Sequence, residues 1–256
     1  MNKQLISKIG NIVGEIKSIT RLEEQGCTSI VQKITTNKGN YLLKSSFEKR
    51  YRDWLKQEAQ VLEKLVNQTK IPVPHFYGFI EENDASHLIM SLEDGISLSS
   101  ALGKAKDSQE KIALIKSFGS LLQQLHEIVP IDPLNHEGEW LEVQLELAER
   151  HLEQGGVDGD KLLLEKLKLH KPLPVKQTVI HGDCTTDNVL VINGEVKMFI
   201  DVAGMTVGDP RYDESLAIGR LKNHEEYLRA FYEGYKRYQV SSEEYSYFDE
   251  GLYEFF

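Results

Sequence analysis

Two carboxylates and an amide lie close together in the stretch VIHGDCTTDNVLVINGEVKMFID, residues 179–201. Two short apolar runs, 189–192 and 196–200, flank the dipeptide Asn193-Gly194. Asn-Gly between β-rich runs is the strongest short-range signal for a hairpin, because a tight primed turn needs positive φ at both central residues. The stretch therefore predicts a β-hairpin with polar residues gathered at its open end.

The expected turn also predicts which polar side chains meet. A two-residue turn pairs Ile192 with Glu195 and places Asn188 opposite Phe199. Asp201 then lies at the same open end as Asn188, and diagonal neighbours in a ladder are about 7 Å apart. Amide and carboxylate oxygens are hard ligands that suit Mg²⁺. Asn188 and Asp201 are therefore a candidate magnesium site.

A second carboxylate, Asp183, follows His181-Gly182 on the loop that leads into the same end. These polar residues could instead satisfy the backbone of a tight loop, but the convergence of two carboxylates and an amide favours chemistry. A His-x-Asp pair could also be half of a metal-hydrolase site, which needs further His or Asp ligands nearby. The other close histidine, His170, is predicted to face solvent.

The composition is that of a soluble globular protein of 256 residues, with 40% hydrophobic and 27% charged residues. No apolar run approaches the roughly 20 residues of a membrane span, and the N-terminus lacks a secretory signal, so we expect a cytoplasmic protein without a membrane partner. Two cysteines, Cys27 and Cys184, are too few for a disulfide framework. The net charge of -10 disfavours a nucleic-acid partner and favours a cationic small molecule.

The apolar pattern changes along the chain from strand-like to helix-like spacing. Strands are predicted at 29–36, 40–46, 75–80 and 87–92. Helices are predicted at 47–67, 108–128, 140–154 and 161–170, and again after Pro210. A β-rich part followed by a helical part with one inserted hairpin predicts two lobes that meet near residues 92–95.

A charged pair is predicted within the β-rich part. Lys44 lies on the strand YLLKSS, and Glu58 falls on the apolar stripe of the next helix, beside Leu55 and Leu62. A carboxylate that faces a core is costly unless it is paired, so Lys44 is the expected partner. Such a pair would hold the ammonium ready for an anionic phosphate. The alternative is a solvated lysine and a glutamate at the edge of the helix face.

A turn of small residues, Gln25-Gly26-Cys27-Thr28-Ser29, precedes the first of these strands. Free amides and hydroxyls in such a turn can cover phosphates. The turn matches neither G-x-x-x-x-G-K-[ST] nor G-x-G-x-x-G, so taken alone it predicts no more than a turn.

In order, the chain offers a strand lysine, a helix glutamate, H-G-D-C-T-T-D-N and F-I-D. This series resembles the aminoglycoside phosphotransferase and choline kinase superfamily, which has a protein-kinase-like fold. Gly182, where protein kinases usually have Arg, disfavours a protein kinase. The resemblance implies a two-lobed α+β fold. Residues 1–92 would form a β-rich N-lobe with a five-stranded antiparallel sheet and a helix, and 93–256 a mostly helical C-lobe.

The resemblance also implies roles for individual residues. Asp183 would be the catalytic residue that orients the substrate hydroxyl and accepts its proton, and Asn188 and Asp201 would hold Mg²⁺ on the nucleotide. His181 and Asp213 would be structural members of the catalytic loop. The nucleotide would be ATP, with GTP as the alternative, and the residues implied to bind it are Thr28, Ser29, Lys44, Glu58, Met90, Ser91, Leu92 and Glu93.

Three further segments, LIMSLEDG, EQGGVDGD and the terminal YEFF, are similar to those of bacterial aminoglycoside 3'-phosphotransferases. In that group an acidic loop and the C-terminal carboxylate hold the amino groups of the drug. The matching candidates here are Glu153, Asp158, Asp160, Glu254 and the carboxylate of Phe256. The alternative for these residues is a solvated acidic surface.

The sequence leaves other acceptors and other functions open. Residues 202–205, VAGM, depart from the C/L-G-R that usually follows F-I-D in the drug-modifying group. The acceptor could therefore be choline, homoserine, methylthioribose, fructosamine or a macrolide instead of an aminoglycoside. A metal-dependent phosphoesterase that uses Asp183 and Asp201, or a non-catalytic nucleotide-binding module, are the alternatives outside the kinase class.

Overall fold

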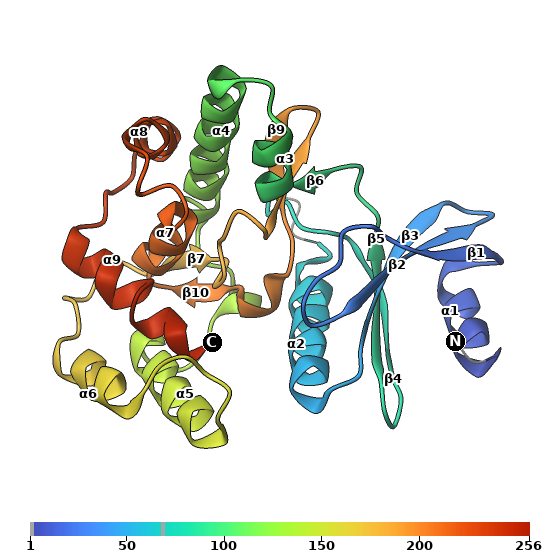
Figure 1. Ribbon diagram of the computed structural model, residues 1–256. Coiled ribbons are helices and arrows are strands. Elements are labelled where there is room, and N and C mark those ends of the chain that lie inside the picture. The colour runs from blue at the N-terminus through green and yellow to red at the C-terminus, as the bar shows by residue number, and fades with distance from the viewer. Residues whose placement is uncertain (1–2, 68–69) are drawn as a thin grey trace. The chain divides into compact units, whose positions relative to one another are not determined.

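The computed structural model describes residues 3–67 and 70–256 (Figure 1). The chain divides into two compact units. The first ends at Asp94 and includes Ile200–Gly204, and the second contains Gly95–Phe199 and Met205–Phe256. Segment 200–204, which carries Asp201, thus belongs to the first unit although it follows the hairpin in the chain. Among the described helices, none has the length and apolarity of a membrane span.

The first unit is built on a five-stranded antiparallel sheet in the order β1-β2-β3-β5-β4. Its elements are α1 (Lys3–Val13), β1 (Ile16–Arg21), β2 (Ile30–Thr36), β3 (Asn40–Ser46), α2 (Lys49–Leu65), β4 (Phe76–Glu81), β5 (Ser86–Ser91) and the 3₁₀ helix η2 (Val202–Gly204). The four predicted strands and the predicted helix are present to within two residues at each end. Helix α1 was not predicted.

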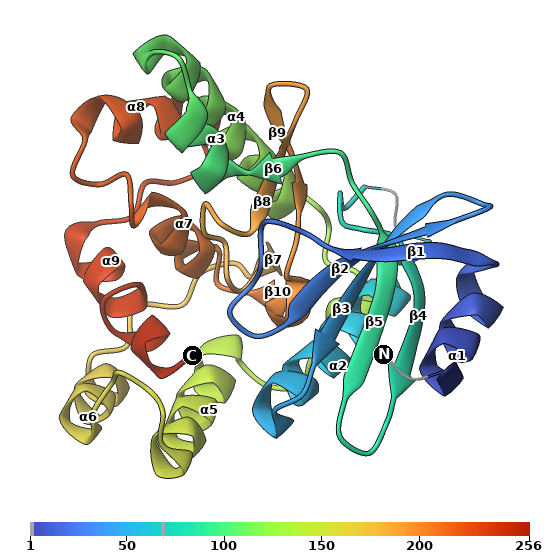
Figure 2. The same ribbon diagram turned by 45° about the vertical axis from the view of Figure 1, so that its right-hand side comes forward.

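The two helices of this unit cover opposite faces of the sheet (Figure 2). Leu43 pairs with Ile89 across β3 and β5, and both pack in one buried cluster with Ile9 of α1. Successive side chains of a strand point to opposite faces. Lys44, the next residue of β3, therefore points to the face that α2 covers.

The second unit contains the other helices and two small sheets. Its elements are β6 (Ile96–Ser97), α3 (Leu98–Lys104), α4 (Ser108–His126), η1 (Asp132–Leu134), α5 (Trp140–Gln154), α6 (Lys161–Leu169), β7 (Thr178–Ile180), β8 (Val189–Ile192), β9 (Glu195–Phe199), β10 (Thr206–Gly208), α7 (Pro210–Ile218), α8 (Glu225–Gly234), α9 (Ser242–Phe248) and η3 (Leu252–Phe255). Strands β6, β8 and β9 form one antiparallel sheet, and β7 pairs with β10 in the other.

The predicted hairpin forms from β8 and β9, but its register differs from the prediction at the open end. Ile192 pairs with Glu195 as expected. Val189 pairs with Phe199, so the predicted pairing of Asn188 with Phe199 is wrong. The cause is a register shift between Leu190 and Val191, because a bulge places two residues of one strand opposite one of the other.

A buried apolar cluster joins α5, α6, α7, α9 and η3 to β7. Its fully buried members include Ile180, directly before the catalytic-loop motif, and Leu252 and Phe255 near the C-terminus. The segment before His181 and the C-terminal segment are thus fixed in the same apolar core of the second unit.

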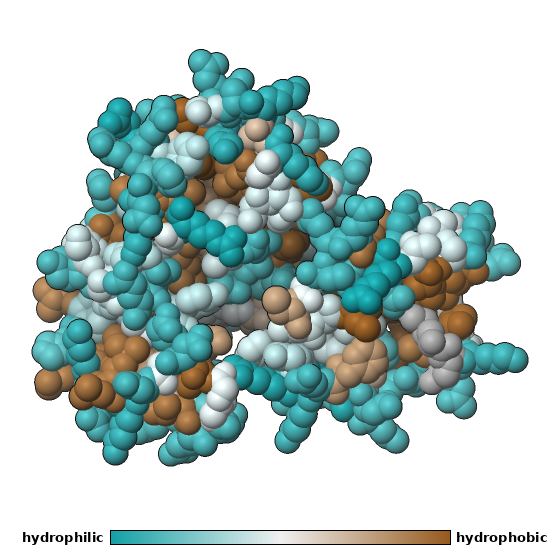
Figure 3. Space-filling model, viewed as in Figure 1, coloured by the Kyte–Doolittle hydropathy of each residue, from teal (hydrophilic) through white to brown (hydrophobic). Residues whose placement is uncertain are grey.

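Exposed apolar side chains gather over α6 and the residues that follow it (Figure 3). Leu162, Leu169 and Leu173 are 75%, 78% and 84% exposed. Leu164 and Leu167 on the same helix are buried, so α6 is apolar on more than the face that packs into the core.

Helices α4 and α8 approach each other through two glycines. A Cβ at Gly119 would lie 2.2 Å from the backbone oxygen of Phe231, and one at Gly234 would lie 2.0 Å from the backbone oxygen of Lys116. Backbone atoms cannot move aside as a flexible side chain can, so this close packing requires glycine at both positions.

Replacing Gly119 with Ala should destabilise the protein by at least about 2 kcal/mol, because the added methyl forces α4 and α8 apart. The measurement is urea unfolding followed by circular dichroism. Gly103 is a matched control in α3, where an added Cβ meets nothing within 4 Å. Gly103→Ala should be neutral or stabilise by up to about 1 kcal/mol, because Ala favours a helix. Equal effects of the two substitutions would contradict the packing account.

Candidate active site

A largely enclosed lysine in the first unit lies between two carboxylates. The Lys44 Nζ donates to Glu58 Oε2 at 2.8 Å and also to Asp201 Oδ1. The Lys44 and Glu58 side chains are 12% and 5% exposed. Burial lowers the pKa of the Lys44 ammonium, but the charges and hydrogen bonds of Asp201 and Glu58 outweigh burial and raise that pKa above its ordinary value. Lys44 is therefore a fixed cation at neutral pH.

Local structure explains how these three residues meet. Lys44 points to the α2 face of the sheet, and Glu58 is buried on the face of α2 that packs there. Asp201 has a φ of 57°, in the left-handed region that aspartate tolerates better than most residues, and is followed at once by η2, which packs against α2. The predicted pair of Lys44 and Glu58 is confirmed, and the contact of Lys44 with Asp201 is additional.

The predicted phosphate-covering turn is tied to the end of β3. The Ser46 hydroxyl donates to the backbone oxygen of Thr28 at 3.1 Å and lies 2.6 Å from the Ser29 hydroxyl. Two hydrogen bonds thus fix the last residues of the turn, while Cys27 before them is exposed.

The predicted hinge follows β5 and is ordered by a serine. Met90 is buried at 3% exposure. The Ser91 hydroxyl donates to the Glu93 carboxylate and accepts from the backbone N–H of His75 at 2.9 Å. Leu92, between Ser91 and Glu93 in the sequence, is half-buried. The backbone of this segment is thus fixed at the end of the strand.

The carboxylate of Asp183 in the second unit has a donor on each oxygen. The Asn188 Nδ2 donates to Asp183 Oδ2 at 2.7 Å and to the Asp183 backbone oxygen at 2.9 Å. The Tyr253 hydroxyl donates to Asp183 Oδ1 at 3.0 Å. The two site residues of the H-G-D-x-x-x-x-N motif are therefore in direct contact, and a tyrosine from the C-terminus joins them.

A fully buried carboxylate, Asp213, holds the backbone of the His181-Gly182-Asp183 loop. It accepts the N–H of His181 at 2.6 Å and the N–H of Gly182 at 2.8 Å. Gly182 has a φ of 83°, which suits glycine. His181 is also fully buried, and its Nδ1 accepts the N–H of Asp183 at 3.2 Å. The structural roles predicted for Asp213 and His181 agree with these contacts.

Behind Asp213 lies a histidine that sequence reasoning did not single out. The His126 Nε2 is 3.3 Å from Asp213 Oδ2, and its Nδ1 is 2.9 Å from the Tyr235 hydroxyl. A carboxylate can only accept, so Nε2–H donates to Asp213 and Nδ1 accepts from Tyr235. His126 ends the apolar face of α4 and would have been found there as a buried polar residue.

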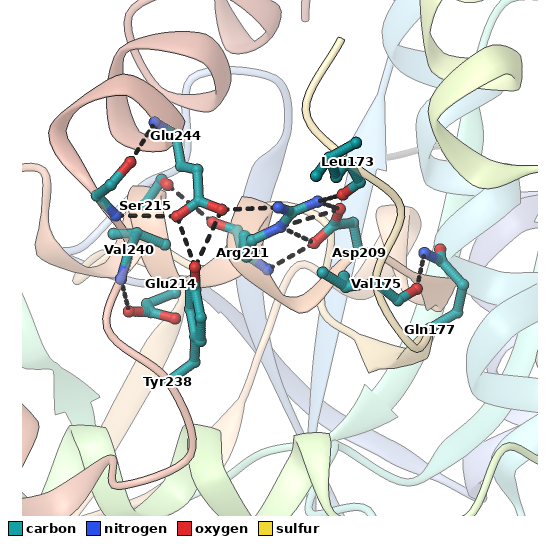
Figure 4. A network of polar contacts seen from close by, with 11 residues as sticks. Leu173, Val175, Gln177, Asp209, Arg211, Glu214, Ser215, Tyr238, Val240 and Glu244 are labelled. Atoms are coloured by element: carbon teal, nitrogen blue, oxygen red, sulfur yellow. Dashed lines mark hydrogen bonds and ion pairs between the residues drawn. The ribbon is translucent and has the colours of Figure 1, made fainter.

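An ion-pair network fixes α7, the helix that carries Asp213 (Figure 4). Arg211 donates to Asp209 at 2.6 Å, to Glu244 at 2.7 Å and to the backbone oxygen of Leu173 at 2.9 Å. The network thus ties the start of α7 to α9 and to the segment before β7.

Glu214, the next residue after Asp213, is a buried carboxyl group. Its Oε1 accepts the N–H of Val240 at 2.8 Å and the Tyr232 hydroxyl at 2.9 Å, whereas Oε2 has no hydrogen-bond partner within the described part of the chain. Burial outweighs these hydrogen bonds and the attraction of Arg211, and raises the pKa of Glu214 to about 7. Figure 4 shows the side chain beside Val240.

Five residues are predicted to bind the phosphate acceptor, and the structure brings three of them, Asp158, Glu254 and Phe256, to the C-terminal segment. The backbone oxygen of Glu254 accepts the N–H of Asp158 at 3.1 Å, and the Phe256 ring lies 5.2 Å from the His151 ring. Burial, and then the nearby charge of Asp158, raise the pKa of Glu254. This edge of the second unit is therefore acidic.

The other two residues predicted to bind the acceptor are Asp160 and Glu153, and within the described part of the chain neither hydrogen-bonds to Glu254 or Phe256. Asp160 is the N-cap of α6 and accepts the N–H of Leu163 at 2.8 Å. Glu153 is exposed near the end of α5. The contact of Asp160 gives it a structural role that the acidic-loop prediction did not include.

The predicted Mg²⁺ ligands can be tested on their donor chemistry. Because Asn188 uses its Nδ2 to bind Asp183, its amide oxygen is directed elsewhere and is a hard donor. Asp201 supplies a carboxylate in the first unit. These oxygen donors fit Mg²⁺. In the described ranges, no group of three or more His, Cys, Asp and Glu side chains is arranged to hold a metal.

The family model described as "Phosphotransferase enzyme family" matches residues 20–249. The chain belongs to this family. The predicted superfamily and enzyme class, a phosphotransferase, are thereby confirmed, and the match spans both units.

Solved structures share the protein-kinase-like fold. An aminoglycoside-3'-phosphotransferase of type VIII is 23% identical, with 93% of each chain covered and a TM-score of 0.73. A thermostable mutant of aminoglycoside phosphotransferase APH(4)-Ia is 18% identical, with 97% of this chain and 87% of that chain covered and a TM-score of 0.69. Macrolide 2'-phosphotransferase MphH from Brachybacterium faecium is 16% identical, with 96% of this chain and 86% of that chain covered and a TM-score of 0.60. The predicted fold class is confirmed.

Replacing Asp213 with Asn should destabilise the protein by about 2–3 kcal/mol, because His181 and Gly182 donate to different oxygens and the amide nitrogen of Asn would leave one of these buried N–H groups without an acceptor. Thermal and urea unfolding measure the effect. Asp187→Asn is the control in the same loop, because its ion pair with Arg220 is exposed and contributes less than about 1 kcal/mol. A loss for Asp213→Asn no larger than the control would contradict the bracing role.

Glu214 should make stability fall as pH rises. Its pKa in the folded state, about 7, lies above the ordinary 4.5, so the folded protein binds the extra proton between these values. The contribution is favourable below pH 4.5 and is lost as pH rises to about 7. Glu214→Gln should therefore gain about 2 kcal/mol relative to wild type between pH 5 and pH 8, measured by urea unfolding. A stability difference that is the same at both pH values would contradict the shift.

Proposed function

We propose that this protein is a Mg²⁺-dependent kinase that transfers the γ-phosphate of ATP to a hydroxyl of a small cationic or sugar-like molecule, with an aminoglycoside as the leading acceptor. The observation that carries the proposal is the Asp183 carboxylate. It is held on both oxygens, and the loop that carries it is braced by Asp213. In a family of phosphotransferases, this is the group suited to receive the acceptor's proton.

Asp183 orients the acceptor hydroxyl and takes its proton as the hydroxyl oxygen bonds to the γ-phosphorus. The bond from the γ-phosphorus to the bridging oxygen of ADP breaks, and ADP leaves with that electron pair. The hydrogen bonds from Asn188 and Tyr253 hold the carboxylate in one orientation for this step. Little covalent help is needed, because positioning and charge neutralisation carry the reaction.

Lys44 supplies a fixed positive charge for the nucleotide phosphates. Its ammonium remains protonated although it is buried, and Glu58 holds it in place. Asn188 and Asp201 would hold Mg²⁺, which neutralises charge on the phosphate oxygens when bound. Asp201 also accepts a hydrogen bond from Lys44, so the cation and this carboxylate are paired.

The acidic C-terminal edge supports a cationic acceptor. Asp158 and Glu254 lie together in the second unit, and the chain as a whole has a net charge of -10. The match to a 3'-phosphotransferase of aminoglycosides supports an aminoglycoside. A macrolide phosphotransferase shares the fold, so a macrolide or one of the metabolites named above is the alternative.

A coupled ADP-release assay with MgATP tests the proposal against kanamycin, neomycin, a macrolide, choline, homoserine, methylthioribose and fructosamine. Turnover with kanamycin or neomycin alone supports the aminoglycoside. Turnover with another compound of the panel supports the kinase activity and identifies a different class of acceptor. Phosphate release from a phosphomonoester without nucleotide would instead support the phosphoesterase, and silence throughout would contradict the kinase.

Asp183→Ala should remove turnover and leave nucleotide binding nearly intact, because the residue acts on the acceptor hydroxyl. Steady-state ADP release and isothermal titration with MgATP measure the two properties. Asp187→Ala is the matched control, since Asp187 lies in the same loop and is half exposed. Turnover of Asp183→Ala within tenfold of wild type would exclude the assigned role.

A further inference from the structure

Tyr253 contacts the catalytic carboxylate, although neither the motifs nor the family match assigns it a role. It lies in η3, three residues before the last residue of the sequence, and its hydroxyl is 3.0 Å from Asp183 Oδ1. We propose that Tyr253 is a positioning residue that holds the Asp183 carboxylate in the orientation needed for phosphoryl transfer. The inference rests on the proposed function.

The segment that carries Tyr253 is rigidly attached to the second unit. The neighbouring residues Leu252 and Phe255 are fully buried. The backbone oxygen of Glu254 accepts the N–H groups of Asp158 and Gly159 at 3.1 and 2.9 Å. The Tyr253 hydroxyl is therefore presented from a fixed backbone and not from a loose chain end.

Close packing at a glycine strengthens this attachment. A Cβ at Gly159 would lie 2.5 Å from the Phe255 ring, so the ring rests directly on the backbone of the α5–α6 loop. The backbone oxygen of Phe255 is also 2.9 Å from His151 Nδ1, which donates to it. The α5–α6 loop and helix α5 thus both hold η3.

The two donors on Asp183 have complementary effects. Asn188 binds Oδ2 and Tyr253 binds Oδ1, so rotation of the carboxylate about its Cβ–Cγ bond would break both hydrogen bonds. Both donors are neutral, so neither of them cancels the negative charge of a carboxylate.

The tyrosine can only donate in this contact. Burial, and then the charge and hydrogen bond of Asp183, raise the pKa of the Tyr253 hydroxyl above its ordinary value of 10.0. The hydroxyl therefore stays protonated at every pH at which the enzyme would work. The Tyr253 side chain is half-buried, and its ring packs edge-on against the Tyr212 ring. This contact restricts the position of the ring that carries the hydroxyl.

Tyr253→Phe removes the hydroxyl and keeps the ring. Tyr247→Phe is the matched control, because Tyr247 is buried in α9 and its hydroxyl donates to the backbone oxygen of Leu167. ADP release is measured with MgATP and the panel acceptor that wild type turns over fastest. We expect kcat of Tyr253→Phe to fall about tenfold, with KM for ATP unchanged, since hydrogen bonds to charged groups are stronger than neutral ones. Tyr247→Phe should keep kcat within twofold.

A second measurement needs no substrate. The Cζ resonances of the 11 tyrosines are recorded during a pH titration of ¹³C-labelled protein, and the Tyr253 resonance is assigned by its loss in Tyr253→Phe. In Asp183→Asn the charge beside Tyr253 is gone, so its pKa should fall relative to wild type. The Tyr247 resonance should be unchanged between the two proteins.

The outcomes separate this inference from the proposed function. A wild type that is silent with every acceptor rejects the proposed function, and the titration then decides the contact by itself. A Tyr253 resonance that titrates alike in wild type and Asp183→Asn overturns the inference. So does a Tyr253→Phe variant whose kcat matches that of Tyr247→Phe. A selective kcat loss together with a shifted Tyr253 titration supports it.

Discussion

The candidate site depends on one buried carboxylate. Asp213 is fully buried, and a buried charge is tolerated when its oxygens are hydrogen-bonded. It meets this requirement with the N–H groups of His181 and Gly182 and with His126. The same bonds fix the backbone of His181 and Gly182, directly before Asp183, so the hydrogen bonds that Asp213 requires set the geometry of this loop.

Successive layers support that carboxylate. Arg211, two residues earlier on α7, is held by Asp209 and Glu244, and Tyr235 holds the far nitrogen of His126. The apolar cluster around β7 places the loop from the other side. Charged groups that are costly to bury are thus arranged so that each fixes the next, from the helices to the catalytic side chain.

The first unit repeats the principle with a cation. Lys44 lies between Glu58 and Asp201 and donates a hydrogen bond to each carboxylate. In the proposed kinase, this held ammonium would meet the nucleotide phosphates.

Residues with a strong local signal were predictable from the sequence, and those fixed by distant parts of the chain were not. Helical spacing placed Glu58 on the buried stripe, and Asn193-Gly194 fixed the turn of the hairpin. The bulge near Leu190 shifted the register, because bulges carry no clear sequence pattern. Tyr253 reaches Asp183 through tertiary packing over 70 residues of chain, which no local pattern encodes.

The most direct test of the account is mass spectrometry of the acceptors after incubation with Mg²⁺ and ATP labelled with ¹⁸O in the γ-phosphate. We expect one acceptor to gain a phosphoryl group that carries the label, while labelled inorganic phosphate stays at background. Labelled inorganic phosphate without any phosphorylated acceptor would show hydrolysis in place of transfer and would contradict the central claim.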